Sequence, residues 1–103
     1  MIVQYYTCIT TYAEPTLKQL VLLRVTQWYE VGLHLDLDET DLATIECNNP
    51  KDLKACVRQM FTMWLHNSVT KPNYKVLLDA LVAAEDQRAI YELCQMFSKQ
   101  RNT

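Results

Sequence analysis

Cysteine and histidine are the most reactive side chains in this sequence, and their spacing argues against catalysis and metal binding. The 103 residues include four cysteines and two histidines. A zinc site needs closely spaced ligand pairs, but the chain has neither a C-x-x-C motif nor a Cys/His cluster. A cysteine nucleophile needs a base, yet His34 lies in an acidic segment and His66 at the end of a predicted helix. We therefore expect no enzyme activity, no metal and no cofactor.

The four cysteines, Cys8, Cys47, Cys56 and Cys94, allow more than one disulfide pairing, and their spacing does not select among the pairings. Cys56 and Cys94 fall at apolar positions of helical patterns, where a free thiol behaves as a small hydrophobic group. Reduced thiols are typical of the cytosol. The chain also lacks an apolar stretch of the roughly 20 residues that span a bilayer, and it has no basic segment typical of a secretory signal. These features predict a cytoplasmic protein without a membrane partner.

Charged residues are segregated along the chain into two runs of opposite sign. Residues 34–46 contain no Lys or Arg, and their acids form the predicted acidic patch: Asp36, Asp38, Glu39, Asp41 and Glu46. Residues 51–75 contain one acid, and their cations form the predicted basic patch: Lys51, Lys54, Arg58, Lys71 and Lys75.

The two patches are candidate partner-binding surfaces. In a helical projection Lys51, Lys54 and Arg58 share one face beside the apolar stripe. Complementary patches on different parts of one surface favour a heterologous contact, which propagates into rings or open filaments. Both runs also fit solvated helix faces, with the acids stabilising a helix N-terminus, and this alternative stays open.

Composition indicates that one all-helical domain positions these residues. Half of the chain is apolar (50%), 21% is charged, and glycine occurs once. Hairpin-rich β proteins need glycine at positive φ, so its scarcity favours helices and also excludes a glycine-rich phosphate loop. The net charge of -2 supplies no basic field for nucleic acid. We predict a compact antiparallel six-helix bundle.

Apolar residues recur at helical spacing from Pro15 onward, which predicts a first helix over residues 15–25. Thr26 is placed to cap a short second helix that contains Gly32. Glycine lowers helix propensity by about 1 kcal/mol relative to alanine, so we expect a neighbouring helix to approach Gly32 closely. Asp38 begins a third helix with an acidic first turn.

A break at residues 48–50 predicts a fourth helix, with Asn49 as its N-cap and Pro50 as its first residue. A polar loop at 66–73 separates it from a fifth helix, and a sixth ends near Phe97. The apolar positions of these helices define a predicted core of Trp28, Leu42, Ile45, Leu53, Val57, Met60, Trp64, Leu77, Leu81, Ile90 and Leu93.

Three segments follow from these patterns. Residues 1–13 are rich in tyrosine, threonine and β-branched residues, and we interpret them as an extended arm or linker. Residues 14–98 form the helical bundle, and residues 99–103 a polar C-terminal tail. Whether the arm packs on the domain or belongs to a longer protein stays open.

The order and spacing of the apolar and tryptophan residues resemble the death domain. The run from Thr26 to Leu37, with the segment Asp38–Leu53, resembles the second and third helices of that family. Cys56–Leu65 is similar to its fourth helix and tryptophan, and Tyr74–Leu81 to its fifth. The resemblance covers about residues 15–97.

Two positions depart from the family pattern. Asp36 stands where many members have glycine, and Gly32 stands where alanine is common. Caspase-recruitment and death-effector domains, which share the six-helix topology, therefore stay as alternatives.

The resemblance implies a homotypic protein-interaction module. Its partners would be other death-fold domains on the same or a different chain, including homo-oligomers, in cytosolic apoptotic or innate-immune signalling. Two alternatives come from other classes: a helical DNA-binding domain and an inert structural bundle. DNA binding needs basic residues at a helix start, which only the fourth helix approaches, and the net acidity opposes it. We expect no nucleic-acid partner.

Overall fold

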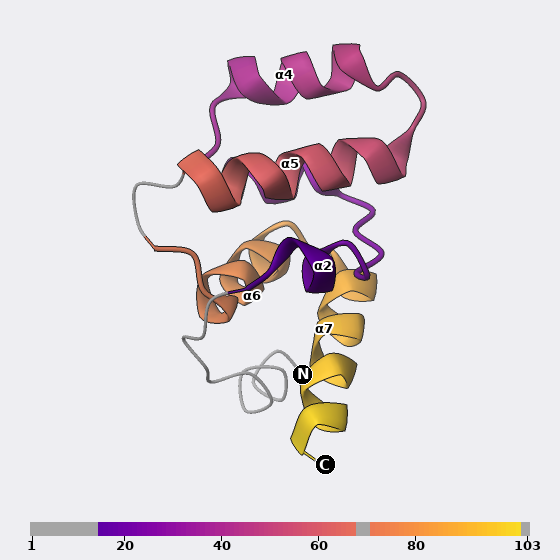
Figure 1. Cartoon of the computed structure of the whole chain (residues 1–103), viewed down its shortest axis with the longest axis vertical. Coiled ribbons are helices and arrows are strands. Elements are labelled where there is room, and N and C mark those ends of the chain that lie inside the picture. The colour runs from indigo at the N-terminus through magenta and orange to yellow at the C-terminus, as the bar shows by residue number, and fades with distance from the viewer. Residues whose placement is uncertain (1–14, 68–70, 102–103) are drawn as a thin grey trace.

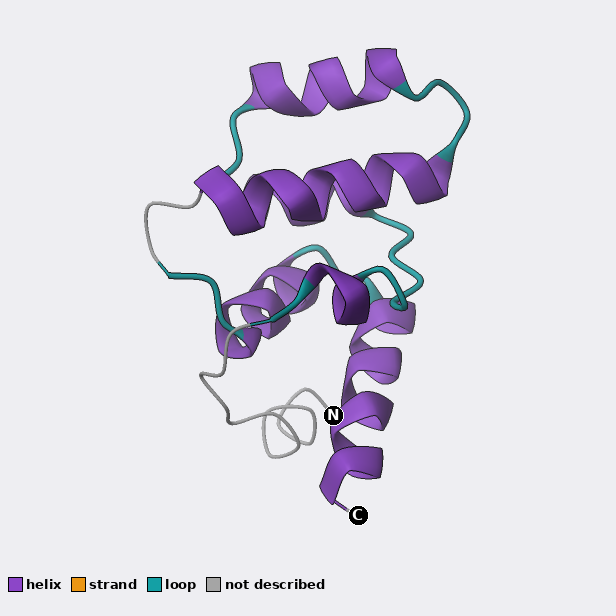
Figure 2. Ribbon diagram, in the orientation of Figure 1, coloured by secondary structure: helices purple, strands orange, loops and turns teal. Residues whose placement is uncertain are grey.

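The computed structural model describes residues 15–67 and 71–101, so the predicted arm at 1–13 lies outside the described residues. Within the described ranges the chain forms helices and no strand (Figure 2), which confirms the all-α prediction. The helices are α2 (Leu17–Leu20), α3 (Trp28–His34), α4 (Glu39–Asn48), α5 (Leu53–Asn67), α6 (Tyr74–Ala83) and α7 (Gln87–Arg101).

Helix α5 is central to the packing. It contacts α2, α3 and α4, while α3 also packs on α4 and α6, and α6 packs on α7. Figure 1 shows α4 and α5 running antiparallel at one end of the molecule, with α6 and α7 toward the other. The radius of gyration is 13.1 Å, close to the ~13 Å expected of a compact domain of about 100 residues.

One apolar core joins all six described helices. The predicted core residues are buried with one exception, and Met60, Trp64, Leu77 and Leu81 are at most 1% exposed. Leu53 is the exception, because 47% of it is exposed. It fits the apolar spacing of α5, but it is the first residue of that helix and lines an open groove beside residues 21–26.

The bounds of α2 and the cap of α3 differ from the prediction. Helix α2 begins at Leu17 with Thr16 as its cap, and it ends at Leu20, well short of residue 25. Thr26 does not cap α3, because its hydroxyl donates to the Asp86 carboxylate at 3.1 Å. The segment from α2 to α3 is therefore held by Asp86, just before α7, and not by an extended first helix.

Helix α5 begins three residues later than predicted. Pro50 and Lys51 form a turn that is closed by the Asp52 N–H, which donates to the Asn49 carbonyl at 3.2 Å. Lys51 has φ of 61°, so the turn has the form of a type II β-turn. Asp52, and not Asn49, caps the helix by accepting the N–H of Ala55 at 3.1 Å.

The expected close approach at Gly32 is present. A Cβ added there would lie 2.6 Å from Cδ2 of Leu42 on α4 and 3.4 Å from Cγ of Met60 on α5. Both neighbours are fully buried. Glycine at this position therefore allows α3 to pack against α4 and α5.

Candidate functional site

The acidic patch lies on the α3–α4 connection and on α4. Asp36, Asp38, Glu39 and Glu46 are exposed, and Asp41 is half-buried. Asp38 occupies the N-cap position of α4, but its side chain makes no capping hydrogen bond. Glu39 and Asp41 still lie in the first turn, where the helix dipole favours negative charge. Helix capping therefore does not account for the Asp38 carboxylate.

Asp36 terminates α3 in the left-handed region, with φ of 67°. The N–H of Leu37 donates to the Gly32 carbonyl at 3.0 Å, and the N–H of Asp36 donates to the Leu33 carbonyl at 3.1 Å. This is the Schellman arrangement, in which glycine is the preferred residue. Asp36 therefore follows the last turn of α3, and its side chain is exposed.

The predicted basic patch is divided in two by the fold. Lys51, Lys54 and Arg58 are exposed at the start of α5, although Lys51 lies in the preceding turn and not on the helical face that the projection assigned to it. We call these three residues the α5 cluster. Lys71 and Lys75 follow the other end of α5, a helix about 22 Å long for its 15 residues. Lys75 donates to Asp79 at 2.9 Å.

The acids and the α5 cluster lie toward opposite ends of the α4–α5 pair. The two helices are antiparallel, so the acidic first turn of α4 lies beside the end of α5, and the α5 cluster lies beside the end of α4 (Figure 1). Glu46 is the member of the acidic patch that departs from this separation. It is near enough to the start of α5 that its charge acts on Cys56. The pair therefore has one mainly acidic and one mainly basic end.

A family model of the death domain matches residues 14–97. The chain belongs to the death-domain family. Comparisons with curated proteins and with solved structures found no match. Death domains are non-catalytic protein-interaction modules that generally bind other death-fold domains. No helix in the described part of this death domain has the length and apolar content of a membrane span.

Among the described cysteines of this death domain, Cys47 is exposed and Cys56 and Cys94 are buried, and Cys8 lies outside the described residues. Burial raises the pKa of the Cys56 thiol, and the negative charges of Asp52 and Glu46 raise it further. A raised pKa disfavours the thiolate, which is the nucleophilic form. Within the described residues no cluster of His, Cys, Asp or Glu is arranged to hold a metal ion.

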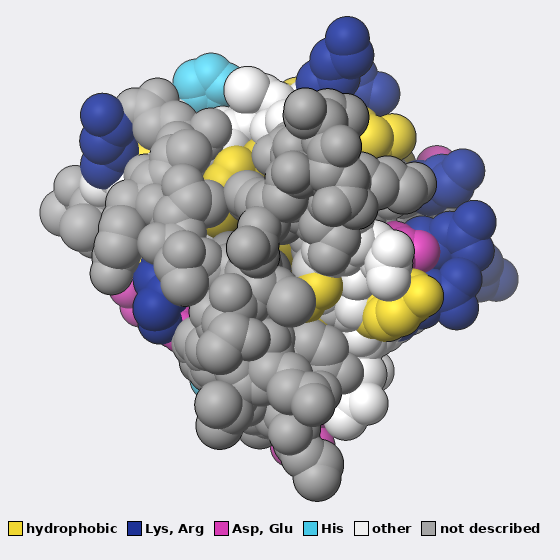
Figure 3. Space-filling view, turned by 90° about the horizontal axis from the view of Figure 1, so that it is seen from below, with side chains coloured by type: hydrophobic (Ala, Val, Ile, Leu, Met, Phe, Trp, Pro, Cys, Tyr) yellow, Lys and Arg dark blue, Asp and Glu magenta, His cyan; other side chains and the backbone are white. Residues whose placement is uncertain are grey.

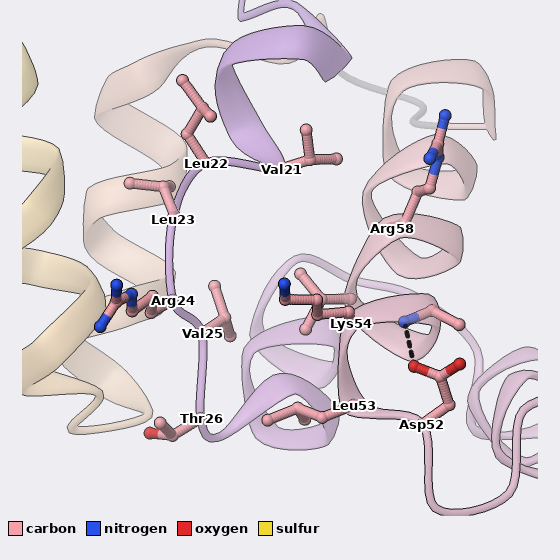
Figure 4. Close-up of a pocket in the computed structure, with 12 residues that line it drawn as sticks. Val21, Leu22, Leu23, Arg24, Val25, Thr26, Asp52, Leu53, Lys54 and Arg58 are labelled. Carbon is pink, nitrogen blue, oxygen red and sulfur yellow. Dashed lines mark hydrogen bonds between the residues drawn. The ribbon is translucent and has the colours of Figure 1, made fainter.

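Sequence reasoning missed a groove beside the α5 cluster. A cavity of about 930 Å³ lies between residues 21–26 and the start of α5 (Figure 4). Val21 and Leu22 line it, and they are exposed because α2 ends before them. The signal was present in the sequence: four consecutive apolar residues, 20–23, cannot all face one side of an amphipathic helix.

Proposed function

We propose that this death domain assembles head to tail with other death-fold domains, including further copies of itself, in cytoplasmic apoptotic or innate-immune signalling. The acidic patch of one domain binds the α5 cluster of the next. The observation that supports the proposal is that the acidic patch and the α5 cluster lie toward opposite ends of the α4–α5 pair. Family membership supports the class of partner.

The positions of the charges favour a heterologous contact over a two-fold contact centred on either patch. A two-fold axis through the acidic patch would bring Asp38 and Glu39 against their own copies. When the acidic end of one domain instead contacts the basic end of another, opposite charges are paired. The resulting pair of domains still has one unbound acidic end and one unbound basic end. Such contacts add domains until a ring closes or a filament grows.

Electrostatic pairing of this kind depends on salt. The members of both surfaces are mostly exposed, so at physiological ionic strength their field extends over about 8 Å. We expect added salt to slow the encounter of two domains more than it speeds their separation.

The proposed role is non-enzymatic and involves neither nucleic acid nor membrane. The net charge of -2 supports this, as does the suppressed thiolate of Cys56. Lys54 and Arg58 are the basic residues at the start of a long helix, but Asp52 and Glu46 lie close to that start and reduce its field.

Charge reversal at Arg58 tests the proposal. We expect Arg58→Glu to abolish concentration-dependent self-association in sedimentation velocity, or to weaken binding to a death-domain partner at least about tenfold. Lys18→Glu is the matched control, because Lys18 is an exposed cation on α2, outside the α5 cluster. Both variants should melt like the parent. Unchanged association of a folded Arg58→Glu variant would remove the α5 cluster from the interface.

A further inference from the structure

The exposed large apolar side chains of the described residues all lie along one strip. They are Leu22, Tyr91, Leu53 and Val21, which are 69%, 56%, 47% and 40% exposed. Leu53, Val21 and Leu22 line the groove of about 930 Å³. Leu22 and Tyr91 line an adjoining hollow of about 310 Å³, which shares Leu22 and Leu23 with the groove. An apolar patch of this kind is typical of a binding surface.

The groove has two walls and an apolar floor. Figure 4 shows residues 21–26 as one wall and the first turns of α5 as the other, with Val21 and Leu53 on opposite sides. Leu23, Val25 and Val57, which are buried in the core, form part of the lining. A ridge of apolar side chains from a helix fits between such walls.

The rim of the groove is mainly cationic. Lys54, Arg58 and Arg24 line it, against Asp52 as the only acid in the lining. Asp52 caps α5, and Arg24 lies 3.7 Å from Glu92. Within the described residues neither Lys54 nor Arg58 forms an ion pair. Lys54 extends from α5 toward residues 21–26 (Figure 4), and one edge of Figure 3 shows Lys and Arg side chains beside apolar surface.

The described surface of a second copy does not complement this groove. The acidic patch has the right charge, but no large apolar side chain is exposed among residues 36–46. Packing one groove on another would supply apolar side chains but would set Lys54 and Arg58 against the same cations. Neither of these two described surfaces of a second copy supplies exposed large apolar side chains together with a set of carboxylates, so we look to a different protein for the occupant.

We propose that the groove binds an acidic amphipathic helix of a partner protein, with apolar residues of the helix between Leu22 and Leu53 and its carboxylates at Lys54 and Arg58. The groove contact is distinct from head-to-tail assembly, and it does not depend on it. Because both contacts use Lys54 and Arg58, the helix and an assembling domain compete for this surface.

Peptide binding to the full chain tests this inference. The probe is a synthetic helical peptide of about 15 residues, with leucines at i, i+3 and i+7 and glutamates beside them. One control peptide has its leucines replaced by serine, and another has its glutamates replaced by lysine. We expect the acidic peptide to shift backbone amide resonances of residues 21–26 and 52–58, and neither control to do so.

Matched variants of the protein locate the contact. Leu22→Ser and Lys54→Glu should each weaken peptide binding about tenfold or more, because an apolar and an ionic contact are lost. Leu22 and Lys54 are exposed, so both variants should fold. Lys18→Glu should bind like the parent. Glu39→Lys, which reverses one charge of the acidic patch, should lose self-association but keep peptide binding.

Any one of three results would overturn the proposal. These are that the acidic peptide does not bind the parent, that the control peptide with lysines in place of glutamates binds equally well, or that the Leu22→Ser protein binds the acidic peptide as tightly as the parent. If Leu22→Ser loses self-association while the peptide does not bind, the groove accepts a second copy and the assignment of a different partner is wrong. Failure of the head-to-tail contact alone leaves peptide binding intact, so the two proposals fail separately.

Discussion

At the scale of single residues, Asp86 joins two parts of the chain that are distant in sequence. It is the only buried charged side chain among the described residues, at 1% exposed. Its carboxylate accepts the N–H groups of Thr26 and Gln27, both at 2.9 Å, and the N–H of Ala89 at 3.4 Å. The Ala89 bond caps α7. The other two fix the chain where it enters α3, for which Gln27 provides no side-chain cap.

We expect Asp86→Ala to lower the free energy of unfolding by about 2–4 kcal/mol. The change removes a helix cap, worth about 1 kcal/mol, and leaves further N–H groups without their acceptor. Urea denaturation measures the loss. Asp79→Ala is the control, because Asp79 forms an exposed i,i+4 pair with Lys75 and should cost less than about 1 kcal/mol. Equal losses for the two variants would contradict the role of Asp86.

The sequence predicts which residues are buried better than it predicts what polar residues do. The spacing of Val57, Met60 and Trp64 identified a buried face, because burial on a helix follows a local period. In sequence, Glu85 and Asp86 suit a turn between two helices and indicate no distant partner. The partners of Asp86 lie about sixty residues away, as with Thr26, and no local pattern encodes that contact.

At the scale of elements, two helices end on an acid in a left-handed conformation. Asp36 follows α3 with φ of 67°, and Glu85 follows α6 with φ of 56°. At the second site the N–H of Asp86 donates to the Leu81 carbonyl at 3.0 Å, which repeats the Schellman pattern found at Asp36. Side chains other than glycine adopt this conformation at a steric cost.

We expect Asp36→Gly and Glu85→Gly each to raise the free energy of unfolding by up to about 1 kcal/mol, because glycine relieves the left-handed strain. Urea denaturation measures both effects. The two variants should differ in assembly. Asp36→Gly removes a carboxylate from the acidic patch and should weaken self-association, whereas Glu85→Gly should not. If the Asp36→Gly variant assembles like the parent, Asp36 does not take part in the contact.

Helix ends were the least predictable part of the elements. Apolar spacing extended the first helix to residue 25, but the chain leaves the helix after Leu20 because Thr26 and Gln27 bind Asp86. Pro50 suits a first helical turn as well as the second position of a β-turn. The sequence does not distinguish these two roles, and the turn at Pro50 and Lys51 is the one observed.

At the scale of the whole molecule, the fold was predictable and the shape of its surface was not. Order and spacing of the helices follow from local patterns, so the six-helix bundle could be read from residues 15–97. The groove and the division of the basic patch depend on where helices pack relative to one another. Lys51 and Lys71 belong to the same basic run in sequence, but α5 separates them.

Mixing two charge variants tests the polarity of the proposed assembly. Glu39→Lys impairs the acidic end of the domain and keeps the α5 cluster, and Arg58→Glu impairs the α5 cluster and keeps the acidic end. Each variant alone should remain monomeric. Their equimolar mixture retains one intact surface of each kind, so it should associate where neither variant does alone.

Sedimentation velocity at low and high salt distinguishes the possible contacts. A head-to-tail contact gives monomers for each variant, association for the mixture and assemblies larger than a dimer for the parent, and added salt weakens both associated states. A mixture of Arg58→Glu with Lys18→Glu is the control. The Lys18→Glu protein keeps both its acidic patch and its α5 cluster, so it should assemble with itself. The Arg58→Glu protein keeps only the acidic patch, so it should join such an assembly only at an exposed α5 cluster. A two-fold contact that joins each acidic patch to the α5 cluster of the other copy closes as a dimer, so the parent would then form dimers and nothing larger. A mixture that stays monomeric while both variants are folded would exclude the head-to-tail contact.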